Sequence, residues 1–215
     1  MGRSNEFHAG RGLSIAQTPA HAGMNFSNLQ VTDEHISAVH KAYEALPDHD
    51  PSAEPAFSAM AEETKRQFDS LGRRGINVEV VDHDPYDNYS QLADDLRNNS
   101  RIKVLATRQT GGHPFFSNDT NDMFRAVHDV YGHAGTGRDF SRHGEEAAFQ
   151  AHRRMYTPLA RAAMATETRG QNATLIATGG FAPQKVALLP ATMRGTALVT
   201  GRRSSGNLGP QFRSI

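Results

Sequence analysis

The sequence contains no cysteine among its 215 residues, and no tryptophan. Disulfide bonds, thiolate metal ligands and cysteine catalysis are therefore excluded. No apolar run approaches the ~20 residues that a membrane-spanning helix requires. The charged segment 1–12 is not followed by an apolar stretch, so we expect neither a secretory signal nor a membrane partner.

An excess of either charge is also missing, since 23 Lys and Arg residues balance 23 Asp and Glu residues. Proteins that bind nucleic acid usually carry a clear basic excess, so the composition does not indicate nucleic-acid binding. Histidine, by contrast, occurs 11 times. Without thiolates, a transition-metal site would have to use imidazole and carboxylate ligands, which suit iron, manganese or zinc.

The length fits a single domain, which we place at residues 31–190 and expect to be α+β and mostly helical. Residues 1–30 are polar and show no sustained period, so they are predicted to form an extended N-terminal arm outside the core. Residues 191–215 contain four Arg and no acid, and we expect this basic C-terminal tail to be disordered on its own.

Apolar residues at helical spacing and short β-branched runs predict the elements of this domain. Helices are expected over 32–46, 54–71, 89–97, 117–132, 144–156 and 158–168, and strands over 76–81 and 102–106. The order strand, short helix, strand predicts a small βαβ-like unit with parallel strands, followed by a three-helix segment with the candidate site. Gly132 is expected to end or distort one helix, and Gly170 to end another.

The strongest functional pattern is the pair His128 and His133 in F-R-A-V-H-D-V-Y-G-H. The two residues are five apart, whereas the HExxH motif of zinc proteases needs a spacing of four. On an ideal α-helix five positions rotate by ~140°, so both imidazoles reach one ion only if the helix ends or distorts near Gly132. The spacing leaves a two-histidine site that a carboxylate from another element would complete.

Glu167 is the favoured carboxylate, because small residues around it would let a second helix approach and because a buried carboxylate needs a partner. Glu146 is the second choice. Asp129 is a candidate to orient an imidazole or to act as a general base, and His143 is a further catalytic candidate. The alternatives are histidines that only pack or hydrogen-bond, a salt bridge at Glu167 and a solvated Asp129.

Arg169, Gln171 and Asn172 form a polar run that we expect just after the end of a helix. A guanidinium beside two amides suits recognition of a substrate carboxylate, phosphate or base. Capping of the helix is the alternative for this run. Arg169 could also be the counter-ion of Glu145, Glu146 or Glu167.

H-D-V-Y-G-H resembles the His-Asp/Glu-x-x-Gly-His motif of the pterin-dependent aromatic amino-acid hydroxylases. In that family both histidines bind iron, and a glutamate from a later helix completes a 2-His-1-carboxylate triad. The resemblance implies that His128, His133 and Glu167, which lies in L-A-R-A-A-M-A-T-E-T, bind Fe(II) and leave positions open for dioxygen and substrate. We do not expect a pterin, because no pterin pocket can be identified in the sequence.

A second resemblance extends over more of the chain. It rests on A-Y-E-A-L-P-D-H-D-P, V-V-D-H-D-P-Y, F-R-A-V-H-D-V-Y-G-H, T-E-T-R-G-Q-N and P-Q-K-V-A-L-L-P. These segments are similar to a family of proteins encoded by actinobacterial phages, with related segments in large polyvalent phage and plasmid proteins. The resemblance implies a place in the host cytoplasm or the virion, with phage structural proteins as partners of the two tails.

Three hypotheses follow. The first is a non-haem iron oxygenase or hydroxylase that acts on a small-molecule or polymer substrate, with Fe(II) favoured over zinc or manganese. The second is a virion-associated accessory protein without catalysis, in which the polar cluster stabilises the fold. The third is a metal-assisted hydrolase in which Asp129 or Glu146 activates a bound water.

Overall fold

The computed structural model describes residues 12–195 of the chain. This part contains two parallel strands and seven α-helices. The helices are α1 (Asp33–Glu44), α2 (Glu54–Arg73), α3 (Tyr89–Asn99), α4 (Asn118–Val127), α5 (Arg142–His152), α6 (Pro158–Ala165) and α7 (Gln171–Thr178). The strands are β1 (Asn77–Val81) and β2 (Arg101–Leu105). Two π-helical turns, η5 (His128–Ala134) and η7 (Thr166–Gly170), continue α4 and α6. The expected α+β, mostly helical class is confirmed.

The strand pair forms the βαβ unit that the sequence predicts. β1 and β2 pair in parallel, with Asn77 opposite Arg101 and Val81 opposite Leu105, and α3 is the crossover between them. Alternate residues of β2 are buried, which is the pattern of a strand with one face on the core. β2 packs on α4, so the sheet supports the helix that leads into η5.

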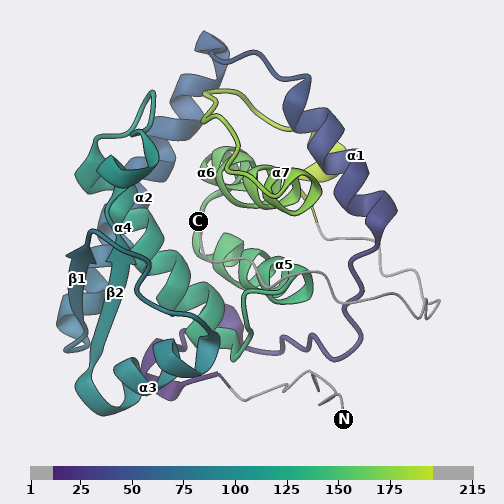
Figure 1. The fold of residues 1–215 in the computed structure, drawn as a ribbon. Helices are drawn as coiled ribbons and strands as arrows, with labels where there is room; N and C mark the ends of the chain where they lie inside the picture. The colour runs from purple at the N-terminus through teal and green to yellow at the C-terminus, as the bar shows by residue number, and fades with distance from the viewer. Residues whose placement is uncertain (1–11, 196–215) are drawn as a thin grey trace.

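The helices lie in three groups around the core (Figure 1). α5, α6 and α7 occupy the middle, α1 covers α7 on one side, and α2 with α4 lies on the other. Large buried side chains such as Phe57 of α2, Phe149 of α5 and Met164 of α6 fill the space between them. Side-chain caps start three of these helices: Thr32, Ser117 and Ser141 each accept a backbone N–H from the first turn.

Gly170 does not end a helix, contrary to the prediction. Its backbone is α-helical, with φ −63° and ψ −50°, and α6, η7 and α7 run on without a break. A Cβ at Gly170 would lie 2.5 Å from Cδ2 of Tyr43, a buried residue of α1. The glycine is therefore needed for close packing, and the run 169–172 lies inside the helix instead of beyond its end.

The described part of the N-terminal arm also packs more closely than its composition suggests. Residues 1–11 and 196–215 of the expected tails lie outside the described residues. Ala16 is fully buried, and the Leu13 N–H donates to the Ala134 carbonyl at 2.8 Å. Nε2 of His21 lies 2.7 Å from the Tyr131 carbonyl oxygen. The contacts of Leu13 and His21 therefore both join the arm to η5.

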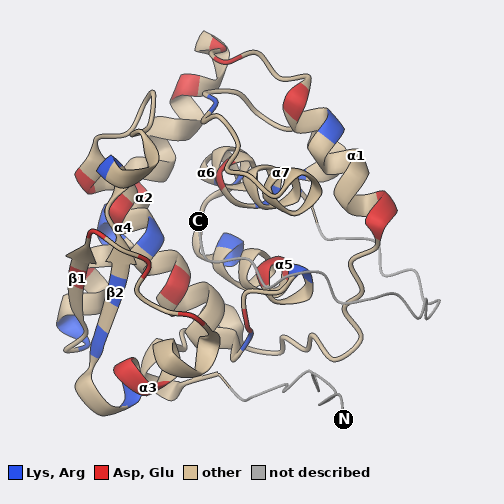
Figure 2. Ribbon diagram, in the orientation of Figure 1, with Lys and Arg blue, Asp and Glu red and all other residues tan. Residues whose placement is uncertain are grey.

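Acidic and basic residues are intermixed along the outer helices (Figure 2), in keeping with the balanced composition. Within residues 12–195, no helix has both the length and the apolar character that crossing a bilayer would require.

The contact at Gly170 can be tested by substitution. We expect Gly170→Ala to lower the free energy of unfolding by about 1–3 kcal/mol, because the added methyl group overpacks a buried site. Gly72→Ala in α2 is the control, since a Cβ there meets no atom within 4 Å. That change should stabilise by about 0.4–1 kcal/mol through the unfolded chain. Urea unfolding of both variants gives the comparison, and equal midpoints would contradict the packing role.

Candidate metal centre

The π-helical turn η5 brings the two imidazoles of the histidine motif together. A π-helix closes its hydrogen bonds from residue i to residue i+5, so a residue five positions later lies one turn above the first. The rings of His128 and His133 accordingly have centroids 5.2 Å apart and stand nearly perpendicular, at 89°. The predicted convergence of the two histidines is confirmed, and the distortion expected near Gly132 is a wider turn.

Gly132 has a second effect, because it lets η5 approach α5 closely. A Cβ at this position would lie 3.0 Å from Cβ of Ala148 in α5. Glu145 and His152 stand three residues before and four residues after Ala148, and therefore share its helical face. The contact thus turns Glu145 and His152 of α5 toward His128 and His133.

Glu145 is the carboxylate that meets both histidines. Its Oε1 lies 3.5 Å from Nε2 of His133, and its Oε2 lies 3.9 Å from Nε2 of His128. One ligand atom from each of the three residues lies within 4.8 Å of the others, and all three residues are buried. Metal–ligand bonds of ~2 Å place two ligands of one ion within ~4 Å, so the three residues could hold a metal ion.

The hydrogen bonds behind His133 and Glu145 leave Nε2 of His133 and Oε1 of Glu145 facing each other. Nδ1 of His133 is 3.1 Å from the carbonyl oxygen of Arg138, which can only accept, so Nδ1 carries the proton. Asn172 donates from Nδ2 to Oε2 of Glu145 at 2.7 Å. His133 Nε2 and Glu145 Oε1 are buried without a hydrogen-bond partner in the structure. Such a facing pair of orphaned atoms fits an ion between them.

The electrostatics of the cluster keep Glu145 anionic. Burial alone would raise its pKa, but the two neighbouring histidines, His133 first, outweigh burial and lower it to about 2. For His133 burial lowers the pKa, whereas the negative charge of Glu145 more than offsets burial and raises it to about 9. The carboxylate is thus in the form that metal binding requires, whereas the raised pKa keeps a proton on Nε2 of His133 that a metal ion would have to displace.

Glu167, the predicted third ligand, lies in a different buried pair. Its Oε1 is 3.3 Å from Nε2 of His113, and its Oε2 accepts a hydrogen bond from Gln171 at 2.9 Å. Nδ1 of His113 accepts the backbone N–H groups of Phe115 and Phe116, so its Nε2 carries the proton that points at Glu167. Glu167 is thus not part of the group that could hold a metal ion, in which Glu145 stands in the place predicted for Glu167.

Glu146, the second choice, is held by Arg169. The guanidinium donates from Nε to Oε2 at 3.0 Å and from the adjacent nitrogen to Oε1, and it lies 4.2 Å over the ring of Phe149. Arg169 is therefore a counter-ion of a neighbouring glutamate, which is the alternative to the expected substrate contact. Glu146 is correspondingly not available as a ligand or as a free general base.

The remaining predicted residues occupy separate places. Asn172 bonds Glu145, and Gln171 bonds Glu167 and Gln184, so the two amides have protein partners. Asp129 is buried in η5, and its charge adds to the raised pKa of His133. His143 is half-buried in the first turn of α5 and does not belong to the metal-binding group.

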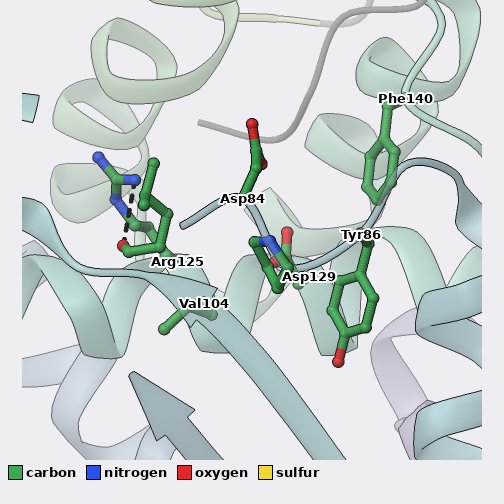
Figure 3. A pocket seen from close by; sticks show the side chains of 8 residues that line it. Asp84, Tyr86, Val104, Arg125, Asp129 and Phe140 are labelled. Atoms are coloured by element: carbon green, nitrogen blue, oxygen red, sulfur yellow. Dashed lines mark hydrogen bonds between the residues drawn. The ribbon is translucent and has the colours of Figure 1, made fainter. Parts of the chain in front are cut away.

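Two small cavities flank the centre. In the first, Asp129 lies between Arg125 and Phe140 beside Asp84 (Figure 3), and the Phe140 ring is 4.8 Å from the His133 ring. The second is lined by Glu145 together with residues of α1 and α7. Each has a volume of about 20 Å³, which is room for about one water molecule. Either of these two cavities would admit a larger ligand only if neighbouring side chains moved.

One signal in the sequence distinguishes the two adjacent glutamates of α5. Glu145, Ala148 and His152 recur at spacings of three and four, with a small residue and a histidine in line. Such a stripe places a carboxylate, a small residue and a histidine on one face of the helix, where the small residue allows another element to approach closely. Glu146 instead shares its face with Gln150, whose amide bonds it at 2.7 Å.

Comparison of the chain with protein-family models, with curated proteins and with solved structures gave no match.

The identity of the carboxylate can be tested with two matched variants. Glu145→Gln removes the negative ligand, so we expect metal affinity to fall more than about 100-fold, beyond the 10–100-fold typical of an outer-shell partner. Glu167→Gln should leave metal affinity unchanged, because Glu167 pairs with His113. Competition with a chromophoric chelator measures both, and the reverse order of affinities would restore Glu167 as the ligand.

The role of Arg169 is tested by Arg169→Lys. A lysine cannot reproduce the two bonds to Glu146, so one partner of a buried ion pair loses its geometry. We expect a loss of up to about 3 kcal/mol in the free energy of unfolding, at the low end of what breaking such a pair costs. The control Arg142→Lys alters a pair with the exposed Asp33 and should cost under about 1 kcal/mol. Equal unfolding midpoints for the two variants would argue against a counter-ion role.

Proposed function

We propose that this chain is a mononuclear metal-dependent enzyme of the 2-His-1-carboxylate type, with His128, His133 and Glu145 as its ligands and Fe(II) as the favoured metal. The observation that carries the proposal is the buried convergence of two imidazole nitrogens and one carboxylate. Two histidines and one carboxylate with open positions are typical of non-haem Fe(II) oxygenases.

The number and type of ligands favour catalysis over a purely structural metal site. Structural zinc sites are usually closed by four protein ligands, commonly cysteines, whereas catalytic sites keep a position for water or substrate. In the described part of the chain, the group of His128, His133 and Glu145 offers three ligands, all nitrogen or oxygen donors. An iron(II) ion bound by them would supply the activation of dioxygen.

The surrounding residues have separate tasks in this proposal. The Arg138 carbonyl orients His133, and Asn172 orients Glu145, as outer partners commonly orient metal ligands. All three ligands are at most 5 % exposed, which keeps bulk water away from the centre. Two cavities that could each hold about one water molecule lie nearby, one lined by Asp129 and the other by Glu145.

Metal-assisted hydrolysis is the second candidate. The observation that favours it is Asp129, a carboxylate that lines the cavity next to the centre and could accept a proton from a metal-bound water. Glu146 does not suit the role of general base, because Arg169 donates a hydrogen bond to its carboxylate. Oxygen dependence separates hydrolysis from oxygenation.

A phage accessory role without catalysis would use the same residues only to stabilise the fold. In that case a bound metal would raise stability, yet neither oxygen uptake nor hydrolysis would accompany it. This third candidate includes the proposals that the protein acts in a phage and that its two tails bind phage structural proteins.

Metal content and stability test the centre directly. Protein purified without a histidine tag should contain close to one metal ion per chain, and a chelator should lower the melting temperature. Free metal at 100 times its dissociation constant contributes about 2.7 kcal/mol, and ~1 kcal/mol corresponds to about 2–4 °C in a chain of this size. We therefore expect a loss of about 5–10 °C that added Fe(II) restores under anaerobic conditions.

The outcomes separate the candidates. Dioxygen uptake by the Fe(II)-loaded protein and its loss in Glu145→Gln would support the oxygenase. Absence of metal binding in the wild-type protein, with no shift in melting temperature, would refute the metal centre altogether.

A further inference from the structure

His128 is held from behind by two further buried side chains on different helices. Its Nδ1 lies 3.2 Å from Nδ1 of His152 in α5. The other nitrogen of His152, Nε2, lies 2.7 Å from Oε1 of Gln67 in α2. The three residues, at most 6 % exposed, form a row from α2 through α5 to the metal-facing imidazole.

The row has a direction, because each contact needs one donor and one acceptor. The Gln67 oxygen only accepts, so Nε2 of His152 donates and carries its proton there. His152 is fully buried among the rings of Phe124, Tyr131 and Tyr156, and no carboxylate of the described residues forms an ion pair with it, so this site stabilises the neutral imidazole. Its Nδ1 is then a lone pair that accepts from Nδ1 of His128.

The consequence falls on the far nitrogen of His128. With the proton on Nδ1, its Nε2 presents a lone pair on the side of Glu145, which is the form that a metal ion requires. If the Gln67 amide were turned over, its NH2 would donate to His152, and each proton in the row would move to the opposite nitrogen. His128 would then carry Nε2–H and point a proton at the metal position.

We propose that Gln67, acting through His152, sets the tautomer of His128 and thereby its readiness to bind the metal. Gln67 and His152 are positioning residues in this proposal, which rests on the proposed metal centre.

The test is Gln67→Met, which keeps the length of the side chain and removes its hydrogen bond. We expect the affinity for cobalt(II), measured against a chromophoric chelator, to fall about 10–100-fold, as for other outer partners of metal-binding histidines. Gln150→Met is the matched control: Gln150 is equally buried and bonds Glu146, outside the metal-binding group. Its affinity for cobalt(II) should stay at the wild-type value.

A spectroscopic readout separates the tautomer from general damage to the fold. Nitrogen-15 NMR of the metal-free protein should show the proton of His128 on Nδ1 in the wild type and in Gln150→Met. In Gln67→Met a share of His128 should carry the proton on Nε2. Wild-type protein with His128 protonated only at Nε2, or equal cobalt affinity in Gln67→Met and the control, would overturn the proposal.

The two proposals fail in different ways. Wild-type protein that binds no cobalt or iron, but shows the expected proton on Nδ1, would refute the metal centre and leave the row intact. Metal binding with the proton on the wrong nitrogen would refute the row alone.

Discussion

The centre depends on the close contact between η5 and α5. The contact needs a residue without a side chain at Gly132 and a small one at Ala148, because a Cβ on the glycine would already stand 3.0 Å from the alanine methyl group. This contact sets the distance from His128 and His133 to Glu145, because Glu145 lies on the same face of α5 as Ala148. The wider turn of η5 then places both imidazoles on that side.

The buried charges around this contact are arranged in pairs, and the pairs explain why so few of the polar residues are free for chemistry. Glu146 binds Arg169, and Glu167 meets His113. Since a buried charge without a partner costs several kcal/mol, each of these glutamates is committed to the side chain that faces it. Glu145 differs, because two histidines, His128 and His133, face it and the three residues could hold a metal ion.

Support for the ligands comes from elements that are distant in the chain. Asn172 comes from α7, and Gln67 comes from α2. The second π-turn, η7, is part of this arrangement, because the continuous helix through Gly170 carries Asn172 onto Glu145. A centre built in this way is part of the core, so binding of a metal should be coupled to the stability of the whole domain.

The sequence by itself determined the class of fold, the parallel βαβ unit and the convergence of His128 and His133. Local spacing decides these features: β-branched runs make strands, apolar periods make helices, and a five-residue spacing near a glycine predicts a distorted turn. The carboxylate was decided only by the tertiary structure. Glu145 and Glu146 are neighbours, ~100° apart on a helix, and packing selects the face that meets η5. Gly170 shows the same limit, since a glycine that ends a helix and one that makes room for Tyr43 are identical in the sequence.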